Sequence, residues 1–307
     1  ILESLRQNAT YNDEMGMYFK DIRSGWFWYE APIETQALII EAFSEIANDK
    51  EVVDELKIWL LKQKQTQDWK TTKATAEACY ALLLQGTDLL ASDEVAKVRL
   101  GNHVVHPSTM PDLKTEAGTG YFKTAWQADE IETDMKNITV TKTDDGVAWG
   151  AVYWQYFEQL DKITHAETPL AIKKELFLKE NTKNGEVLEA LSDGAKINIG
   201  DLVRVRVEIR VDRAMEYVHL KDMRAAGFEP TQTLSRYKYQ EGLGYYESTK
   251  DAATNFFIGY LPKGTYVFEY DLRASHAGDF SNGITTMQCM YAPEFTTHSE
   301  GIRVNIE

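Results

Sequence analysis

The hydrophobic residues of the first 90 or so positions recur at the three-to-four spacing of helices that pack one face against a core. This spacing predicts a helix over residues 33–47. A second helix is expected to follow Asn48 and Asp49, since both residue types cap helix N-termini well. The pattern therefore predicts an N-terminal helical region.

A third helix is expected to begin at a cap on Thr71 or Thr72 and to stop at Gly86. A shift of 40 residues aligns it with the first helix, and the matched positions are Tyr29, Thr35 and Phe43 with Trp69, Thr75 and Leu83. Helical hairpins at that period indicate a stacked or toroidal α/α array. Ordinary helical packing is the alternative.

The region 93–161 has a different character, because short stretches rich in valine, threonine and aromatic residues alternate with turns. Strands are predicted within residues 95–105, 120–126 and 137–140. The region closes on a dense aromatic group that we expect to be largely buried against another layer: Trp149, Val152, Tyr153, Trp154, Tyr156 and Phe157.

Strict alternation of apolar and polar residues over 203–211 predicts a strand with one buried face. Similar alternation over 266–272 and 302–306 favours an antiparallel β-sandwich at the C-terminal end. A polar connector, residues 161–169, is expected to be a hinge before it.

The fold class predicted from these patterns is multidomain α plus β, a partial α/α toroid followed by β-sandwich segments. The expected domains are residues 1–92, 93–161 and 169–307.

Composition narrows the class of partner. The 307 residues are 43% hydrophobic and 26% charged, which is typical of globular proteins and excludes disorder as the main state. A formal charge of -15 makes a nucleic-acid partner unfavourable. No apolar run reaches the roughly 18 residues of a membrane span, so no membrane contact by this segment is expected. We expect the end at Ile1 to result either from processing or from the choice of the segment, and the chain to be a fragment of a longer protein.

Motifs for metal or nucleotide chemistry are weak. His103 and His106 stand three apart in a predicted strand, where their rings point to opposite faces, so a surface or turn role is favoured over a shared ion. Gly242-Leu243-Gly244 lacks the third glycine and the helix of a dinucleotide loop. Acidic runs such as 129–132 are interpreted as solvated faces without a ligand. We therefore predict no catalytic residue, no metal ligand and no cofactor.

The two cysteines, Cys79 and Cys289, are too far apart along the chain to form a disulfide framework, and both are predicted to be buried packing residues.

One cluster of aromatic and acidic residues could serve a sugar-binding cleft, because stacking faces and paired carboxylates suit glycoside hydrolysis. Its members are Trp26, Trp28, Tyr29, Glu30, Glu34, Asp68 and Trp69. Packing between helices is the favoured interpretation of these tryptophans.

In this order, the three regions resemble the C-terminal part of the bacterial α2-macroglobulin family, the large protease-trapping relatives of complement proteins. The stretches most similar to that family are 68–76, 150–157, 200–201, 226–230, 256–257 and 290–295. The resemblance implies the end of a thioester-type helical domain, a CUB-like β segment and a terminal macroglobulin-like, receptor-binding-like sandwich. It also implies target proteases as partners through the full-length protein.

The family's Cys-x-Glu-Gln thioester motif does not occur in this chain. Either the motif lies upstream of Ile1 or this member has none. The resemblance implies a periplasmic or cell-surface location, with a lipid anchor through the missing N-terminus. The expected function is that of a non-catalytic part of a protease-trapping inhibitor. The alternatives are a polysaccharide-acting enzyme built from a toroid and a sandwich, or a surface adhesion module.

The resemblance suggests one further role. A tyrosine of the terminal domain can screen the thioester from water in such proteins, and Tyr245 and Tyr246 follow flexible glycines here. The alternative is that both tyrosines belong to one strand and serve its two faces.

Overall fold

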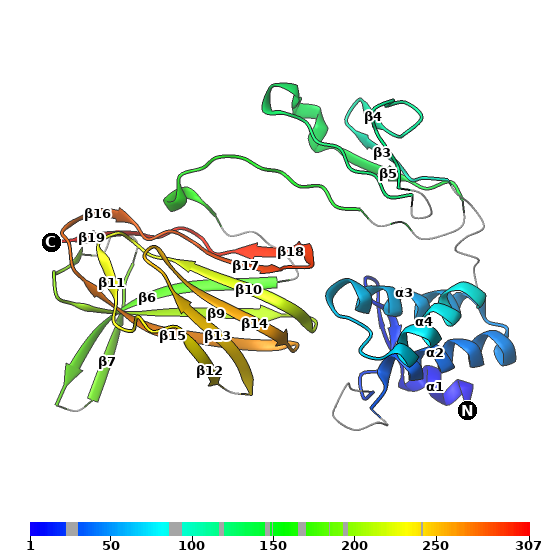
Figure 1. Cartoon of the computed structure of the whole chain (residues 1–307), viewed down its shortest axis with the longest axis horizontal. Helices are drawn as coiled ribbons and strands as arrows, with labels where there is room; N and C mark the ends of the chain where they lie inside the picture. Colours follow the sequence, from blue (N-terminus) through cyan, green and yellow to red (C-terminus); the bar gives the residue numbers. More distant parts are fainter. Residues whose placement is uncertain are drawn as a thin grey trace. The chain divides into compact units, whose positions relative to one another are not determined.

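The computed structural model describes residues 1–22, 30–85, 94–116, 120–144, 148, 150–164, 170–183, 185–192, 196–240 and 242–307 (Figure 1). Its internal contacts divide the chain into two compact units. The first consists of residues 1–62 and 69–152, and the second of residues 63–68 and 153–307. Each unit has hydrophobic core residues of its own.

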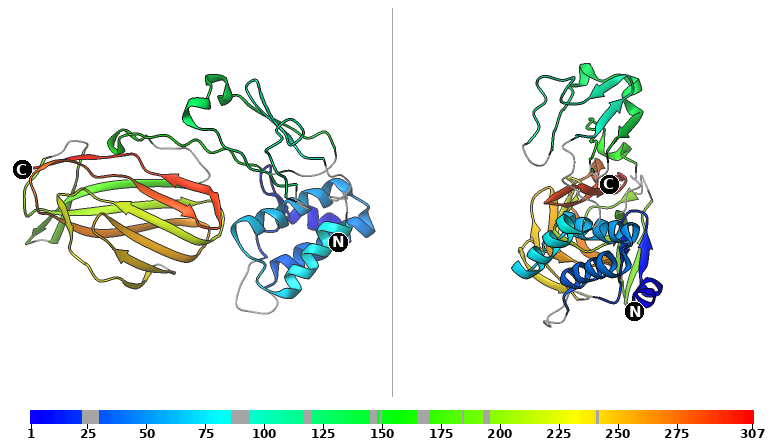
Figure 2. Two further views of the ribbon diagram at one scale, coloured as in Figure 1. Left: turned by 45° about the horizontal axis from the view of Figure 1, so that its top comes forward. Right: turned by 90° about the vertical axis from the view of Figure 1, so that its right-hand side faces the viewer.

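The N-terminal region contains the expected helices, grouped together in blue and cyan in Figures 1 and 2. A short helix and hairpin come first, and the elements are α1 (Leu2–Asn8), β1 (Thr10–Asn12), β2 (Gly16–Tyr18), α2 (Pro32–Ala42), a π-helical turn (Phe43–Ala47), α3 (Lys50–Thr66) and α4 (Thr72–Leu84). The three predicted helices are confirmed as α2 with its π-turn, α3 and α4. The hairpin β1–β2 was not predicted.

Local capping explains where these helices begin. The Asp49 carboxylate accepts a hydrogen bond from the Val52 backbone N–H at 3.2 Å, and the Thr71 hydroxyl accepts one from the Ala74 N–H at 2.9 Å. Helix α4 ends at Leu84, while Gly86 lies outside the described residues. The core between the helices is built from Ile40, Phe43, Val53, Leu56, Leu60, Ala78 and Ala81. An α/α toroid is not confirmed by the four α-helices of the described ranges.

The next part of the chain forms a three-stranded antiparallel sheet of order β4-β3-β5, namely β3 (Lys97–Leu100), β4 (His103–Val105) and β5 (Ile138–Thr141). The predicted strand over 120–126 is wrong. This segment alternates in burial, with Phe122 and Trp126 packed on the small core of the sheet, but it has no partner strand among the described residues. Extended backbone becomes a strand only when a neighbour takes up its hydrogen bonds.

The aromatic group that closes this region is not buried. Trp154 is 50% exposed, Tyr156 76%, and Phe157 fully exposed. The expectation that these rings pack against another layer is therefore wrong for the chain as it stands, since this irregular segment is covered by no strand of the described residues. Trp149 lies outside the described residues.

The C-terminal region is a β-sandwich, as predicted. One sheet has the order β11-β15-β9-β6-β7, the other β12-β13-β14-β10-β17-β18, and a small sheet β16-β19-β8 flanks them. The strands are β6 (Leu170–Thr182), β7 (Gly185–Ala190), β8 (Lys196–Ile197), β9 (Leu202–Val211), β10 (Met215–Met223), β11 (Phe228–Pro230), β12 (Arg236–Gln240), β13 (Leu243–Thr249), β14 (Ala253–Leu261), β15 (Gly264–Ala274), β16 (Gly278–Ser281), β17 (Thr285–Cys289), β18 (Ala292–His298) and β19 (Arg303–Ile306).

The three strands predicted from alternation are confirmed as β9, β15 and β19. Strand β9 lies between β15 and β6, and its inward side chains Val203, Val205, Val207, Ile209 and Val211 are all buried. Their apolar surface meets residues of the opposite sheet, such as Leu220 and Phe256. Burial of this surface contributes about 25 cal/mol per Å² and is the main driving force for folding of the sandwich.

The expected hinge, residues 161–169, is described only as far as 164. Its first part is tied to the sandwich, because Arg303 forms an ion pair with Asp161 at 3.2 Å and the Gly301 N–H donates to the Ile163 carbonyl at 3.0 Å. No helix of the described residues is long and apolar enough to cross a membrane.

Candidate functional site

The two candidate tyrosines lie side by side on β13 and face opposite ways. Tyr245 points into the sandwich, where it is 5% exposed and its ring centroid lies 5.2 Å from Phe268 and 5.8 Å from Phe256. Burial raises the pKa of its phenol to about 12, and the nearby Glu247 carboxylate adds to the shift. Tyr245 is therefore a core residue of the sandwich.

Tyr246 belongs to the outer face of the same sheet. It pairs in register with Tyr237 on β12 and with Phe257 on β14, which in turn pairs with His219 on β10. We call Tyr237, Tyr246, Phe257 and His219 the aromatic row. The rings make contact within two pairs, since the centroids of Tyr237 and Tyr246 are 4.9 Å apart and those of His219 and Phe257 are 4.7 Å apart and nearly parallel.

The aromatic row forms a ridge of rings across four adjacent strands, and Tyr237 is 83% and Phe257 42% exposed. A surface of this kind can bury aromatic area against another protein surface. The glycines before it serve a turn. Gly242 has a φ of +85°, which a glycine adopts without strain, and it joins β12 to β13.

A buried polar network lies inside the sandwich and was missed by the sequence reasoning. Lys174 on β6 forms an ion pair with Asp222 on β10, and Tyr270 and Thr285 donate their hydroxyl hydrogen bonds to the same carboxylate. Burial raises the pKa of the Tyr270 phenol well above its usual value, and the Asp222 charge adds to this. All the polar groups are paired with one another, which is typical of a structural network.

The histidines take separate places. His106 contacts the Ser108 hydroxyl through Nδ1 at 2.6 Å in the turn after β4, whereas His103 Nε2 lies 3.2 Å from a Glu132 carboxylate oxygen.

The two cysteines differ in burial. Cys289 is buried, as predicted, and burial raises the pKa of its thiol, but Cys79 is exposed. The inward positions of α4 are Ala74, Ala78, Ala81 and Leu82, so residue 79 falls on the outer side.

The proposed sugar cleft receives no support. Trp26, Trp28 and Tyr29 lie outside the described residues. Trp69 packs against the helical core, and the Glu34 carboxylate accepts a hydrogen bond from the Thr71 hydroxyl at 3.3 Å. Trp69 thus takes part in helix packing, and Glu34 in a contact at the start of α4.

Comparison with known proteins identifies the sandwich. Residues 170–294 match the family described as Bacterial Alpha-2-macroglobulin MG10 domain. An alpha-2-macroglobulin homolog of Nostoc sp. is 22% identical over 315 aligned residues, which cover 96% of this chain and 16% of that protein. The chain thus spans less than a fifth of the length of this relative.

Two solved structures align with most of the chain at low similarity. A Salmonella alpha-2-macroglobulin reacted with methylamine is 15% identical, with a TM-score of 0.37, over 92% of this chain and 18% of that one. A trypsin activated alpha-2-macroglobulin from Escherichia coli is 12% identical, with a TM-score of 0.42, over 89% of this chain and 18% of that one.

Proposed function

Since the chain belongs to the bacterial α2-macroglobulin family, we propose that it is a non-catalytic part of a protease-trapping inhibitor. The observation that carries the proposal is the match of the sandwich to the MG10 domain, together with a relative that aligns along nearly the whole chain. This part would contribute to the shape of the longer protein and to a surface that shields its thioester. Target proteases would be bound by the longer protein as a whole.

The parts before the sandwich fit the same proposal. Residues 1–92 would be the end of a thioester-type helical domain, and 93–161 would be one half of a CUB-like sandwich. The exposed side chains of Val140 on β5 and of Trp154 and Phe157 support this assignment. Exposed apolar surface of that kind marks a face that another layer covers, and the other half of a sandwich would provide this layer.

The aromatic row is the surface we assign to thioester shielding in the longer protein. Tyr246 is its best-placed tyrosine, because Tyr245 would have to leave the sandwich core to reach any outside group. A tyrosine ring held in a row of rings can exclude water from a reactive ester over a wide area. The thioester itself would lie upstream.

The test uses the full-length protein and follows its reaction with methylamine. Tyr246→Ala is expected to speed the loss of the thioester, and the matched control Tyr291→Ala removes an equally large ring that is 78% exposed and not part of the aromatic row. Equal rates in both variants would reject the shield. A protease that keeps full activity toward large substrates after mixing with the full-length protein would reject the inhibitor function itself.

We also propose a periplasmic or cell-surface location, reached through a lipid anchor upstream of this chain. The proposal is supported by the family alone. Fractionation of cells, followed by release with a detergent, tests it, and recovery of the full-length protein in the cytoplasm would contradict it.

A further inference from the structure

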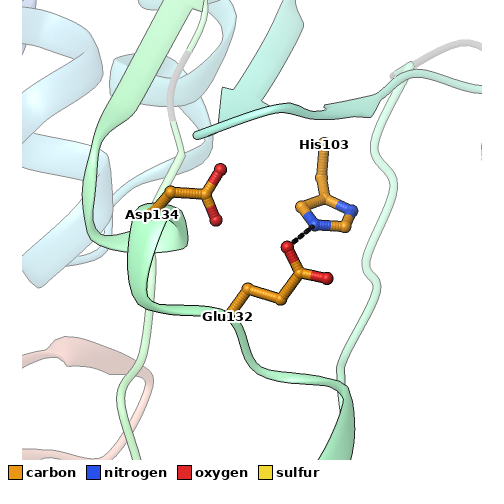
Figure 3. A group of neighbouring side chains, drawn as sticks. All are labelled: His103, Glu132 and Asp134. Carbon is orange, nitrogen blue, oxygen red and sulfur yellow. Dashed lines mark ion pairs between the residues drawn. The ribbon is translucent and has the colours of Figure 1, made fainter.

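Three side chains meet at one end of the small sheet β4-β3-β5 (Figure 3). His103 is the first residue of β4, while Glu132 and Asp134 flank the start of a 3-10 turn (Thr133–Lys136) that leads into β5. One ligand atom from each of the three lies within 4.8 Å of the other two. The group is built from two segments that are about 30 positions apart in the sequence.

The imidazole nitrogen of this group, His103 Nε2, forms no hydrogen bond with any residue that the structure describes. His103 Nε2 is shielded from solvent, and although Glu132 Oε2 lies at ion-pair distance, 3.2 Å, the contact is misaligned for a hydrogen bond. A polar atom that is withdrawn from water without a partner costs about 1–3 kcal/mol. An electrophile placed between the ring and the carboxylates would remove that cost.

Asp134 is held in position without help from an ion. Its Oδ2 accepts hydrogen bonds from the Asn102 backbone N–H at 3.0 Å and from Asn102 Nδ2 at 2.9 Å. Gly101 has a φ of +57°, and a Cβ there would stand 2.4 Å from the same oxygen. The turn between β3 and β4 therefore needs glycine in order to bring its backbone against this carboxylate.

We propose that His103, Glu132 and Asp134 bind one divalent transition-metal ion, with Zn²⁺ the best fit. An imidazole nitrogen with two carboxylates is a set of ligands that Zn²⁺ accepts, and its bond lengths near 2.0–2.2 Å place tetrahedral ligand atoms about 3.3 Å apart. The Nε2 to Oε2 distance already meets this value. Water would fill the fourth position.

The choice of ion follows from ligand type and charge. Ca²⁺ and Mg²⁺ prefer oxygen ligands, so the imidazole disfavours both. The two carboxylates balance the charge of a divalent ion. Bound there, the ion would join β4 to the turn before β5 and stabilise the sheet against local opening.

The test is Zn²⁺ binding to the metal-free 307-residue chain, measured by calorimetry and by long-range ¹H–¹⁵N spectra of its six histidines. One equivalent of Zn²⁺ should bind, and it should change the ¹⁵N chemical shift of a ring nitrogen of one histidine. This change should be absent in His103→Ala. Replacing an outer-shell partner of a bound metal commonly lowers the affinity about 10–100-fold. Loss of a direct ligand should matter at least as much, so both His103→Ala and Glu132→Gln should weaken binding by at least about tenfold. Glu132 is 63% exposed, so its variant should fold normally even where His103→Ala does not.

Two matched controls keep the test specific. His106→Ala removes the neighbouring histidine and Asp129→Asn removes a nearby exposed charge, and neither should weaken binding. Unchanged affinity in Glu132→Gln, an equal loss in His106→Ala, or the failure of the chain to take up one equivalent would overturn the site. Tighter binding of Ca²⁺ than of Zn²⁺ would overturn the choice of ion.

Discussion

Lys174 Nζ lies 2.7 Å from Asp222 Oδ1, and neither side chain reaches solvent. The remaining bonding capacity of the pair is used as well, since Lys174 donates to the Met223 carbonyl and the carboxylate accepts from Thr285 and Tyr270. Withdrawing two charges from water costs several kcal/mol each, and this cost is offset only when such partners are complete. The pair links β6 of one sheet to β10 of the other.

The first prediction concerns this link. Asp222→Ala should lower the free energy of unfolding of the sandwich by about 3–5 kcal/mol, because it leaves a buried ammonium unpaired. The double variant Lys174→Met/Asp222→Ala should lose less than the sum of the single variants. All seven tryptophans precede residue 155, so hydrogen exchange of β6 and β10 peptides, rather than tryptophan fluorescence, is the suitable measurement. Additive losses would contradict the coupling.

The second prediction is the alkaline limit of the sandwich. Burial raises the pKa of Tyr245 from 10.0 to about 12, so its protonated form is favoured in the folded state. The resulting stability is complete below pH 10 and is lost as the pH rises from there toward about 12. Tyr245→Phe should make the decline of the free energy of unfolding over that range less steep. Denaturant unfolding at several alkaline pH values measures it, and identical slopes would refute the assignment.

The third prediction is the acid limit. Burial alone would raise the pKa of Asp271, but its hydrogen bonds from Arg204 and Lys179 outweigh burial and hold the pKa below the usual 3.8. The stability from this carboxylate is therefore present above that pH and lost as the pH falls below it. Asp271→Asn should show a flatter acid unfolding profile than the parent chain. A profile of unchanged steepness would show that another carboxylate dominates.

Local signals explain what the sequence could predict. The caps at Asp49 and Thr71 and the alternation in β9 act over a few neighbouring residues, so α3, α4 and β9 follow from them directly. Lys174 had a readable signal too, because it stands between Ile172 and Leu176 at an inward position of an alternating strand. A lysine at such a position predicts a buried partner.

Other features depend on what lies next to a segment in space. Residues 120–126 have the composition of a strand but lack a paired neighbour among the described residues, and composition does not encode a neighbour. The meeting of His103 with Glu132 depends on an irregular segment between β4 and β5, which no periodicity describes. Tyr245 and Tyr246 could be assigned to two faces of a strand, but the ring contacts of the aromatic row needed the register of four strands.

The fourth prediction concerns the exposed aromatic segment. Trp154 and Phe157 offer large apolar side chains to solvent, and such surface promotes association. Replacing both with serine should reduce concentration-dependent association of the chain in sedimentation velocity, with little change in thermal stability. The control replaces Leu234, which is 80% exposed in a loop of the sandwich, with serine. Equal effects of both changes would mean that the aromatic segment has no special role.

The last prediction concerns the connector 161–169. It is polar and ends in proline, and β6 begins directly after it with Leu170, which is 1% exposed. Limited proteolysis should therefore cut the connector first and leave a stable fragment that starts near Leu170. Arg303 and Gly301 hold residues 161 and 163, so Arg303→Ala should speed cleavage near 161 without changing the fragment's C-terminal end. Mass spectrometry of the fragments decides the question, and a first cut inside 203–211 would show that the domain boundary is misplaced.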